Sequence, residues 1–350
     1  MIVHNRPLIT EADIDTVSKV LRSGWLASGP QTLGLEEDFI RYFGQGGACA
    51  CSSGTAALLL ALRGLGLGRG HKVAVPTYAC SAVLNSVYYS GAEPVLVDVR
   101  PDDFNMNPKA LAKISGSVDA AIAIHTYGAP ADILALKAVV PLVIEDCCQS
   151  LGGLRDGRPL GTDGDAAVFS FYATKIITCG NGGLIWDKLG RVADWARDFR
   201  EFDGRDRYKP RFNFHITDFQ AALARNQFTR LKVILARRQA IAHQYVEVLS
   251  GRVDYQARIS DPERMPYRFV LILNSREERD ALMAFLIDKE VKAAIPIQKF
   301  ELLHRYLEMS SQDFLVAEKL TDTTLSLPLY PALTENEVNT ILKIVDGFFS

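Results

Sequence analysis

Between residues 48 and 186, seven short apolar runs flanked by Gly, Pro or Asp alternate with segments of helical period. Strands buried on both faces of a parallel sheet read as short apolar runs, and parallel strands need crossover connections, usually helices. The sequence therefore predicts an α/β fold built on parallel strands. The predicted strands are residues 48–51, 72–75, 94–97, 120–124, 142–145, 166–169 and 184–186.

Helical patterns flank this region on both sides. Thr10 and Asp13 form the signature of a capped helix, which opens an N-terminal arm. Residues 216–248 show a long amphipathic pattern, after which 266–273 read as a strand and 281–288 as a helix. Since 350 residues exceed one ordinary core, we expect two domains. The arm and large domain would cover residues 1–250, and a smaller α+β domain residues 251–350.

The amino-acid composition limits the kinds of partner that the protein is expected to bind. Lys plus Arg (39) nearly balance Asp plus Glu (41), so no overall positive field favours nucleic acid or anionic membranes. Neither a secretory signal nor a transmembrane stretch is visible, and we expect a cytoplasmic protein. The six cysteines lack the spacing of a zinc site and are interpreted as reduced thiols, with no metal. Adjacent Cys147 and Cys148 are poorly placed to bond each other.

Polar residues directly follow several predicted strands, at the edge of the sheet where ligands gather in parallel α/β folds. After the first strand, Ser53, Gly54 and Thr55 open a helix whose free amides suit a phosphate, although an ordinary helix cap explains them equally well. After the fifth strand, Asp146 is suited to keep a pyridine nitrogen protonated. A turn-forming aspartate is the alternative interpretation.

Lys175 lies in an aromatic and small-residue segment, just before a glycine-rich turn. Most lysines are simply solvated, but burial here would lower the pKa of the amine and let it attack a carbonyl. Ser170, five residues earlier, is placed to donate a hydrogen bond to a phosphate. Residues 211–223 open the long helix, and a plain helix cap is the alternative to a ligand site there.

Taken in order, these segments resemble the DegT/DnrJ/EryC1/StrS family of sugar aminotransferases, and the resemblance covers nearly the whole chain. It implies the aspartate aminotransferase fold, the PLP-transferase fold type I. In that fold a mostly parallel seven-stranded sheet flanked by helices forms the large domain, and a smaller α+β domain follows. The resemblance rests on residues 23–30, 53–58, 125–128, 145–149, 170–175, 213–223 and 326–329.

The resemblance also assigns catalytic roles. It implies that Lys175 forms a Schiff base with pyridoxal 5′-phosphate (PLP) and that Asp146 pairs with the pyridinium nitrogen. Gln149 would lie near the cofactor hydroxyl. Once displaced, Lys175 would be the free amine that moves a proton between the α-carbon of the substrate and the cofactor.

The remaining cofactor contacts are implied in the same way. The amides of Gly54 and Thr55 and the hydroxyl of Ser170 would hold the phosphate. Asn213 would reach the phosphate of the cofactor in the neighbouring subunit. The resemblance therefore implies a homodimer with shared active sites.

Three positions depart from the family pattern. Where the family stacks an aromatic ring on the cofactor, this chain has Cys80, which gives less contact area. Asn181 stands where the glycine-rich turn usually has an acidic residue. In the small domain, the family's His-Tyr and Leu-His pattern is only faintly matched by residues 295–297 and 303–304. Substrate recognition is therefore the least determined feature.

We expect transfer of an amino group from an amino acid, by resemblance glutamate, to a keto sugar that is nucleotide-linked. The product would enter amino-sugar, cell-surface polysaccharide or secondary-metabolite biosynthesis. One alternative is a PLP-dependent sugar dehydratase of the same fold, in which histidine replaces the lysine, so Lys175 argues against it. Another is a non-catalytic PLP-binding regulator. The position of amination and the keto acceptor stay open.

Overall fold

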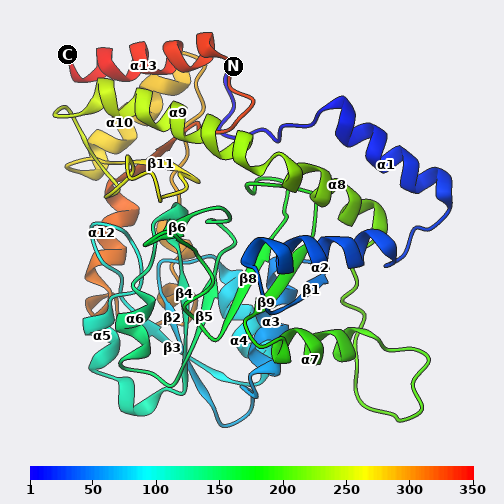
Figure 1. Ribbon diagram of the computed structural model, residues 1–350. Helices are drawn as coiled ribbons and strands as arrows, with labels where there is room; N and C mark the ends of the chain where they lie inside the picture. The colour runs from blue at the N-terminus through cyan, green and yellow to red at the C-terminus, as the bar shows by residue number, and fades with distance from the viewer.

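The computed structural model describes residues 1–350 (Figure 1). A seven-stranded sheet flanked by helices forms the centre of the molecule, with the strand order β1-β9-β8-β5-β4-β2-β3. All seven predicted strands are confirmed, and each differs from its predicted bounds by no more than a residue or so at either end. They are Gly47–Cys51 (β1), Lys72–Pro76 (β2), Glu93–Val97 (β3), Ala120–Ile124 (β4), Leu142–Asp146 (β5), Ala166–Ser170 (β8) and Gly183–Asp187 (β9).

One strand runs against the rest. β2, β3, β4, β5 and β8 pair in parallel, whereas β9 is antiparallel to both β8 and β1. The mostly parallel sheet is therefore confirmed, with β9 as the strand of opposite direction. The reason is the connection over residues 171–182, which contains no helix, so the chain returns beside β8 as a hairpin.

Most helices of the first 250 residues pack around this sheet, whereas the first helix packs against the helix over residues 218–229. The expected cap of the first helix is confirmed, because Thr10 and Asp13 form a capping box. The long pattern over 216–248 is two helices, which meet at Arg230. The α-helices are Glu11–Ser23 (α1), Pro30–Phe43 (α2), Gly54–Gly64 (α3), Ser81–Ser90 (α4), Pro108–Ala112 (α5), Ile133–Lys137 (α6), Arg191–Arg200 (α7), Asp218–Thr229 (α8) and Leu231–Leu249 (α9).

The last hundred residues form a small antiparallel sheet with helices, at the upper left of Figure 1. The strand and helix expected at 266–273 and 281–288 are confirmed. The helix starts earlier than expected because Ser275 caps it by accepting a hydrogen bond from the Glu278 amide. The elements are Asp254–Tyr255 (β10), Phe269–Ile272 (β11), Thr324–Leu327 (β12), Arg276–Asp288 (α10), Leu303–Tyr306 (α11), Leu315–Thr323 (α12) and Glu335–Phe349 (α13).

Two of the three hydrophobic cores contain residues from the C-terminal part of the chain. The larger packs around the seven-stranded sheet and extends to residues that precede β11, such as Met265 and Tyr267. The smaller joins the C-terminal half of α9 to β11, β12, α10 and α13. The division of the chain near residue 250 stays a prediction. None of the helices combines the length and the apolar character that crossing a bilayer requires.

Candidate active site

A cavity of about 400 Å³ opens beyond the carboxyl ends of β4, β5 and β8. Most of the residues predicted from the sequence meet in its wall, although they come from distant parts of the chain. Asn213 is the exception and lies outside this lining. The predicted residues in the wall are Gly54, Thr55, Cys80, Asp146, Gln149, Ser170 and Lys175.

One end of the cavity is built to hold an anion. Ser53 caps α3 and its hydroxyl accepts from the Ala56 amide at 3.1 Å. Gly54 and Thr55, the first residues of the helix, have no intrahelical acceptor, so their amides are free. A side chain at Gly54 would lie 2.8 Å from Cβ of Ser170, so the serine sits directly against these amides. The start of this helix is therefore both capped by Ser53 and open to an anion.

Asp146 ends β5 and is 5% exposed. Its Oδ1 accepts from the Cys148 amide at 2.9 Å, while Oδ2 has no hydrogen-bond donor within the protein. Gln149 follows closely, and its Oε1 accepts from the Tyr127 amide at 2.9 Å, which leaves its amide nitrogen free. A carboxylate oxygen and an amide nitrogen therefore face the cavity without partners of their own.

Lys175 stands in the hairpin loop between β8 and β9, with its Nζ 5.3 Å from the centroid of the Tyr267 ring. Burial, the strongest influence, lowers the pKa of its amine, but charge interactions with Tyr267, with the thiols of Cys148 and Cys80, and with Asp146 more than offset this. The pKa of Lys175 is raised above its ordinary value. The expected lowering is therefore wrong for the free amine, because acidic groups surround the buried nitrogen.

Two of the three departures from the family pattern, Cys80 and Asn181, also lie at the cavity. Cys80 precedes α4 as its N-cap residue, and burial raises the pKa of its thiol. The thiol is accessible from the cavity although protein surrounds it. Asn181 lines the cavity, and its backbone carbonyl accepts from the Gln220 side chain at 2.9 Å. Asn181 thus ties the glycine-rich turn to α8.

Sequence reasoning missed the wall that closes the cavity from the C-terminal part of the chain. Tyr267 and Arg268 stand just before β11, and Tyr267 donates its amide to the Tyr127 carbonyl at 3.2 Å. Tyr127 has a left-handed backbone with φ of 54°, an uncommon conformation that the Gln149 and Tyr267 contacts hold in place. Neither tyrosine could be recognised from the sequence, because helix caps and strand patterns do not mark them as site residues.

The faint small-domain motifs divide in two. Pro296 and Ile297 line the cavity. His304 does not, because it is fully buried between Thr77 Oγ1, at 2.8 Å from its Nδ1, and Glu318 Oε1, at 2.9 Å from its Nε2. His304 therefore joins α11 to the end of β2 and α12, and is no part of the cavity wall.

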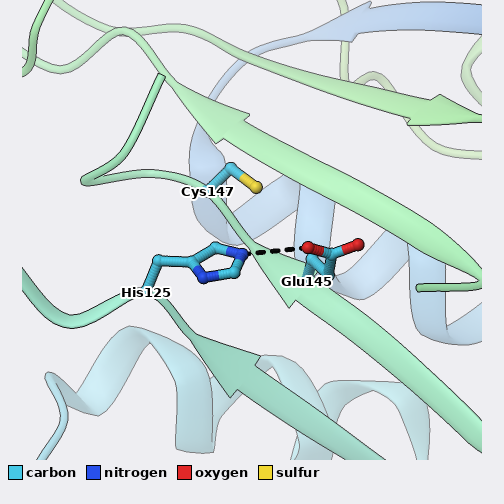
Figure 2. Close-up of side chains that lie close together, drawn as sticks. All are labelled: His125, Glu145 and Cys147. Atoms are coloured by element: carbon cyan, nitrogen blue, oxygen red, sulfur yellow. Dashed lines mark hydrogen bonds and ion pairs between the residues drawn. The ribbon is translucent and has the colours of Figure 1, made fainter. Parts of the chain in front are cut away.

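A second cluster of polar side chains, His125, Glu145 and Cys147, lies buried beside the site (Figure 2). His125 Nδ1 accepts from the Ala131 amide at 2.9 Å, so Nε2 carries the proton and donates to Glu145 at 3.0 Å. Burial raises the pKa of Glu145, but the hydrogen bonds from His125 and from the 161–164 turn outweigh it and lower the pKa. His125 and Glu145 thus use their ligand atoms in hydrogen bonds, which tie the end of β4 to β5 and to the 161–164 turn.

Asn213 lies in the segment that leads into α8. Its side chain accepts from the His215 amide at 3.2 Å, and the residue is exposed. The plain helix cap expected for this region is present, since Thr217 and Gln220 form a capping box at the start of α8. Within one chain, Asn213 does not line the cavity.

The groups that one chain places around the cavity fit PLP. Free amides at the start of α3, beside Ser170, suit a phosphate. The Asp146 carboxylate has an oxygen without a protein donor, and Lys175 supplies the amine in the same cavity. Phosphate, ring nitrogen and aldehyde thus each have a complementary group.

The sequence matches the DegT/DnrJ/EryC1/StrS aminotransferase family from residue 7 to residue 346. The chain belongs to this family. The family is PLP-dependent, so the expected cofactor and the expected aminotransferase class of enzyme are confirmed, as is fold type I. It is a family of sugar aminotransferases, which use a keto sugar and an amino donor.

Solved structures agree over the full length of this aminotransferase. TlmJ from Streptoalloteichus hindustanus is 28% identical with a TM-score of 0.91, covering 99% of this chain and 98% of its own. A DegT DnrJ EryC1 StrS aminotransferase from Brucella abortus is 29% identical with a TM-score of 0.88, covering 97% and 95%. The Spr1654 protein of Streptococcus pneumoniae in its PMP form is 26% identical with a TM-score of 0.92, covering 99% and 97%.

Proposed function

We propose that this aminotransferase moves an amino group from an amino acid, glutamate, to a nucleotide-linked keto sugar. The observation that carries the proposal is the meeting of Lys175, Asp146 and the free amides of α3 around one cavity. An amine, an acid and an anion site together are what a PLP-dependent transfer requires. The pathway, amino-sugar or polysaccharide biosynthesis, follows from the same proposal.

The residues of the chain would divide the work. When bound, PLP supplies an aldehyde and an electron-withdrawing ring. Gly54, Thr55 and Ser170 hold the phosphate, and Asp146 keeps a proton on the ring nitrogen. Lys175, once displaced, would take a proton from the α-carbon of the donor as a base and deliver it as an acid to the carbon that was the aldehyde of PLP.

We also propose that two copies of the chain share their active sites. A second cavity of about 470 Å³ lies where α3, α4 and α7 meet the segment before α8, and it is lined mainly by apolar residues. Phe212 and Tyr89, which line it, are 63% and 80% exposed. A second copy docked there would bury this apolar surface and bring Asn213, between Phe212 and Phe214, towards its neighbour.

A cytoplasmic location stays part of the proposal. All six cysteines are free thiols in the structure, as the sequence predicts. Free thiols persist in a reducing compartment, whereas secreted proteins commonly oxidise theirs.

The test is a two-step reaction. The PLP-loaded protein is mixed with L-glutamate, and the visible absorbance of the lysine-bound cofactor is followed. We expect the band to disappear, and to return when a keto-sugar nucleotide is added, with an amino sugar detected by mass. A band that survives every amino acid would instead indicate a non-catalytic binder, and loss of water from the sugar without amination would indicate a dehydratase.

A further inference from the structure

Arg268 is the cation of the cavity wall that the proposed function leaves unused. It stands directly before β11, and its guanidinium carbon is 5.5 Å from the centroid of the Tyr127 ring and 5.8 Å from that of Tyr267. The two rings hold the guanidinium without neutralising it. Lys175 lies over the same Tyr267 ring at 5.3 Å, so Arg268 and the reactive amine flank one tyrosine.

No carboxylate pairs with Arg268. Its one hydrogen bond within the protein runs from Nη1 to Nε2 of His4, at 3.4 Å, and its Nε is buried without a partner. Burial first, then the charges of Arg268 and Lys292, lower the pKa of His4 to about 3. His4 is therefore a neutral acceptor at physiological pH and leaves the charge of Arg268 uncompensated.

Buried arginines of this chain have acceptors within the protein. Arg200 pairs with Glu36 at 2.7 Å, whereas Arg238, which has no carboxylate partner, donates to the carbonyls of Tyr267 and Leu329 at 3.2 and 3.0 Å. Arg268 has neither kind of acceptor. Withdrawing a guanidinium from water without a counter-ion is unfavourable, so an unpaired arginine in a cavity wall indicates a ligand that brings the negative charge. Asp146 is the one carboxylate in the wall, and its free oxygen is expected to serve the cofactor.

We propose that Arg268 binds the α-carboxylate of the amino-acid donor, with His4 as the residue that positions it. The inference rests on the proposed function, in which the α-carbon of the donor must lie at the Lys175 amine. Arg268 is the other cation of the cavity wall, and it lies over the same Tyr267 ring as Lys175. The planar fork of a guanidinium matches a carboxylate through paired hydrogen bonds, which a point charge cannot supply.

The experiment compares Arg268→Met with Arg276→Met in the PLP-loaded protein. Arg276 is a matched control, since its side chain is 60% exposed at the start of α10. We expect Arg268→Met to lower kcat/KM for L-glutamate about 100-fold, because two charge-assisted hydrogen bonds are lost. The KM for the keto-sugar nucleotide should stay within about twofold of wild type, and Arg276→Met should change neither value.

A second readout does not depend on turnover. Calorimetric titration with glutarate should show binding to the wild-type protein and to Arg276→Met, and none to Arg268→Met. Arg268→Lys keeps the charge and is expected to bind more weakly than wild type, which covers the case in which Arg268→Met fails to fold. His4→Gln, which retains an acceptor, should raise the KM for glutamate less than His4→Ala does, with kcat unchanged in both.

The outcomes separate the two proposals. If glutarate binding depends on Arg268 but glutamate does not discharge the visible band, the carboxylate site stands and the proposed transfer fails. If Arg268→Met binds glutarate as wild type does, the inference is overturned. If the KM for the keto-sugar nucleotide rises instead of that for glutamate, Arg268 serves the diphosphate, and the assignment to the donor is wrong.

Discussion

Lys175 is the residue on which the chemistry depends, and removing its amine gives a direct prediction. Lys175→Ala should lose the visible absorbance of bound PLP and reduce turnover by about 10²–10⁴-fold, since both the linkage and the proton carrier are gone. Absorbance and steady-state kinetics on the same sample provide the measurement. Lys188→Ala, at an exposed position just after β9, is the matched control. Turnover that survives without the amine would contradict the assigned role.

Cys80 gives a prediction about pH. Burial raises the pKa of its thiol, so the thiolate is scarce at neutral pH and its fraction grows as pH rises towards that pKa. Alkylation of Cys80 by iodoacetamide should therefore accelerate about tenfold per unit between pH 7 and 8. Bound PLP should slow it, because Cys80 faces the cavity. Peptide mass spectrometry follows the reaction, with Cys80→Ser as the blank. An alkylation rate that is the same with and without PLP would show that Cys80 lies away from the cofactor.

The sequence marks a residue as a site candidate where it follows a predicted strand or adjoins a predicted turn. Asp146 follows an apolar strand and Lys175 precedes a glycine-rich turn, which made both candidates, but the family resemblance assigned their roles. Tyr267 and Arg268 could not be recognised in this way, since their place in the wall depends on contact with Tyr127, far away in the chain. The raised pKa of Lys175 was equally out of reach, because it depends on which groups the fold gathers around the nitrogen.

At the scale of elements, α2 is held at its start by a carboxylate from α8. Asp218, 1% exposed, accepts from the amides of Gly29, Gln31 and Thr32 and from the Thr32 hydroxyl, at 2.8–3.0 Å. Asp218→Ala would leave these buried and partly buried donors unpaired, so we expect a loss of about 3 kcal/mol in the free energy of unfolding.

Urea unfolding at fixed protein concentration measures this loss. Thr10→Ala removes the half-exposed capping hydroxyl of α1 and serves as the comparison, with an expected loss of about 1 kcal/mol. Equal losses in the two variants would show that Asp218 acts as an ordinary helix cap.

Elements themselves were largely predictable. Each of the seven strands carries its own apolar run, which is why their positions agree with the sequence. The reversed direction of β9 could not be read from its residues, because its apolar run is the same in either orientation. The break at Arg230 was also hidden, since apolar residues continue at helical spacing through α8 and α9.

For the whole molecule, shared sites predict recovery on mixing. Lys175→Ala and Asn213→Ala proteins should each be weakly active, but a hybrid dimer holds one site with both residues intact. After unfolding and refolding together, about a quarter of wild-type activity is expected, since half the dimers are hybrids with one good site. Activity assays and native mass spectrometry follow the exchange. If hybrids form without recovery, each subunit works alone.

The hairpin between β8 and β9 has a practical consequence for engineering. Ser170 pairs with Gly183, and the Phe171 amide donates to the Gly182 carbonyl at 2.8 Å, so the loop carrying Lys175 is sealed at its base. Such a segment can be exchanged as one unit. Chimeras that exchange residues 171–182 between relatives would receive the lysine together with the loop that carries it. The strands on both sides of the loop would keep their register.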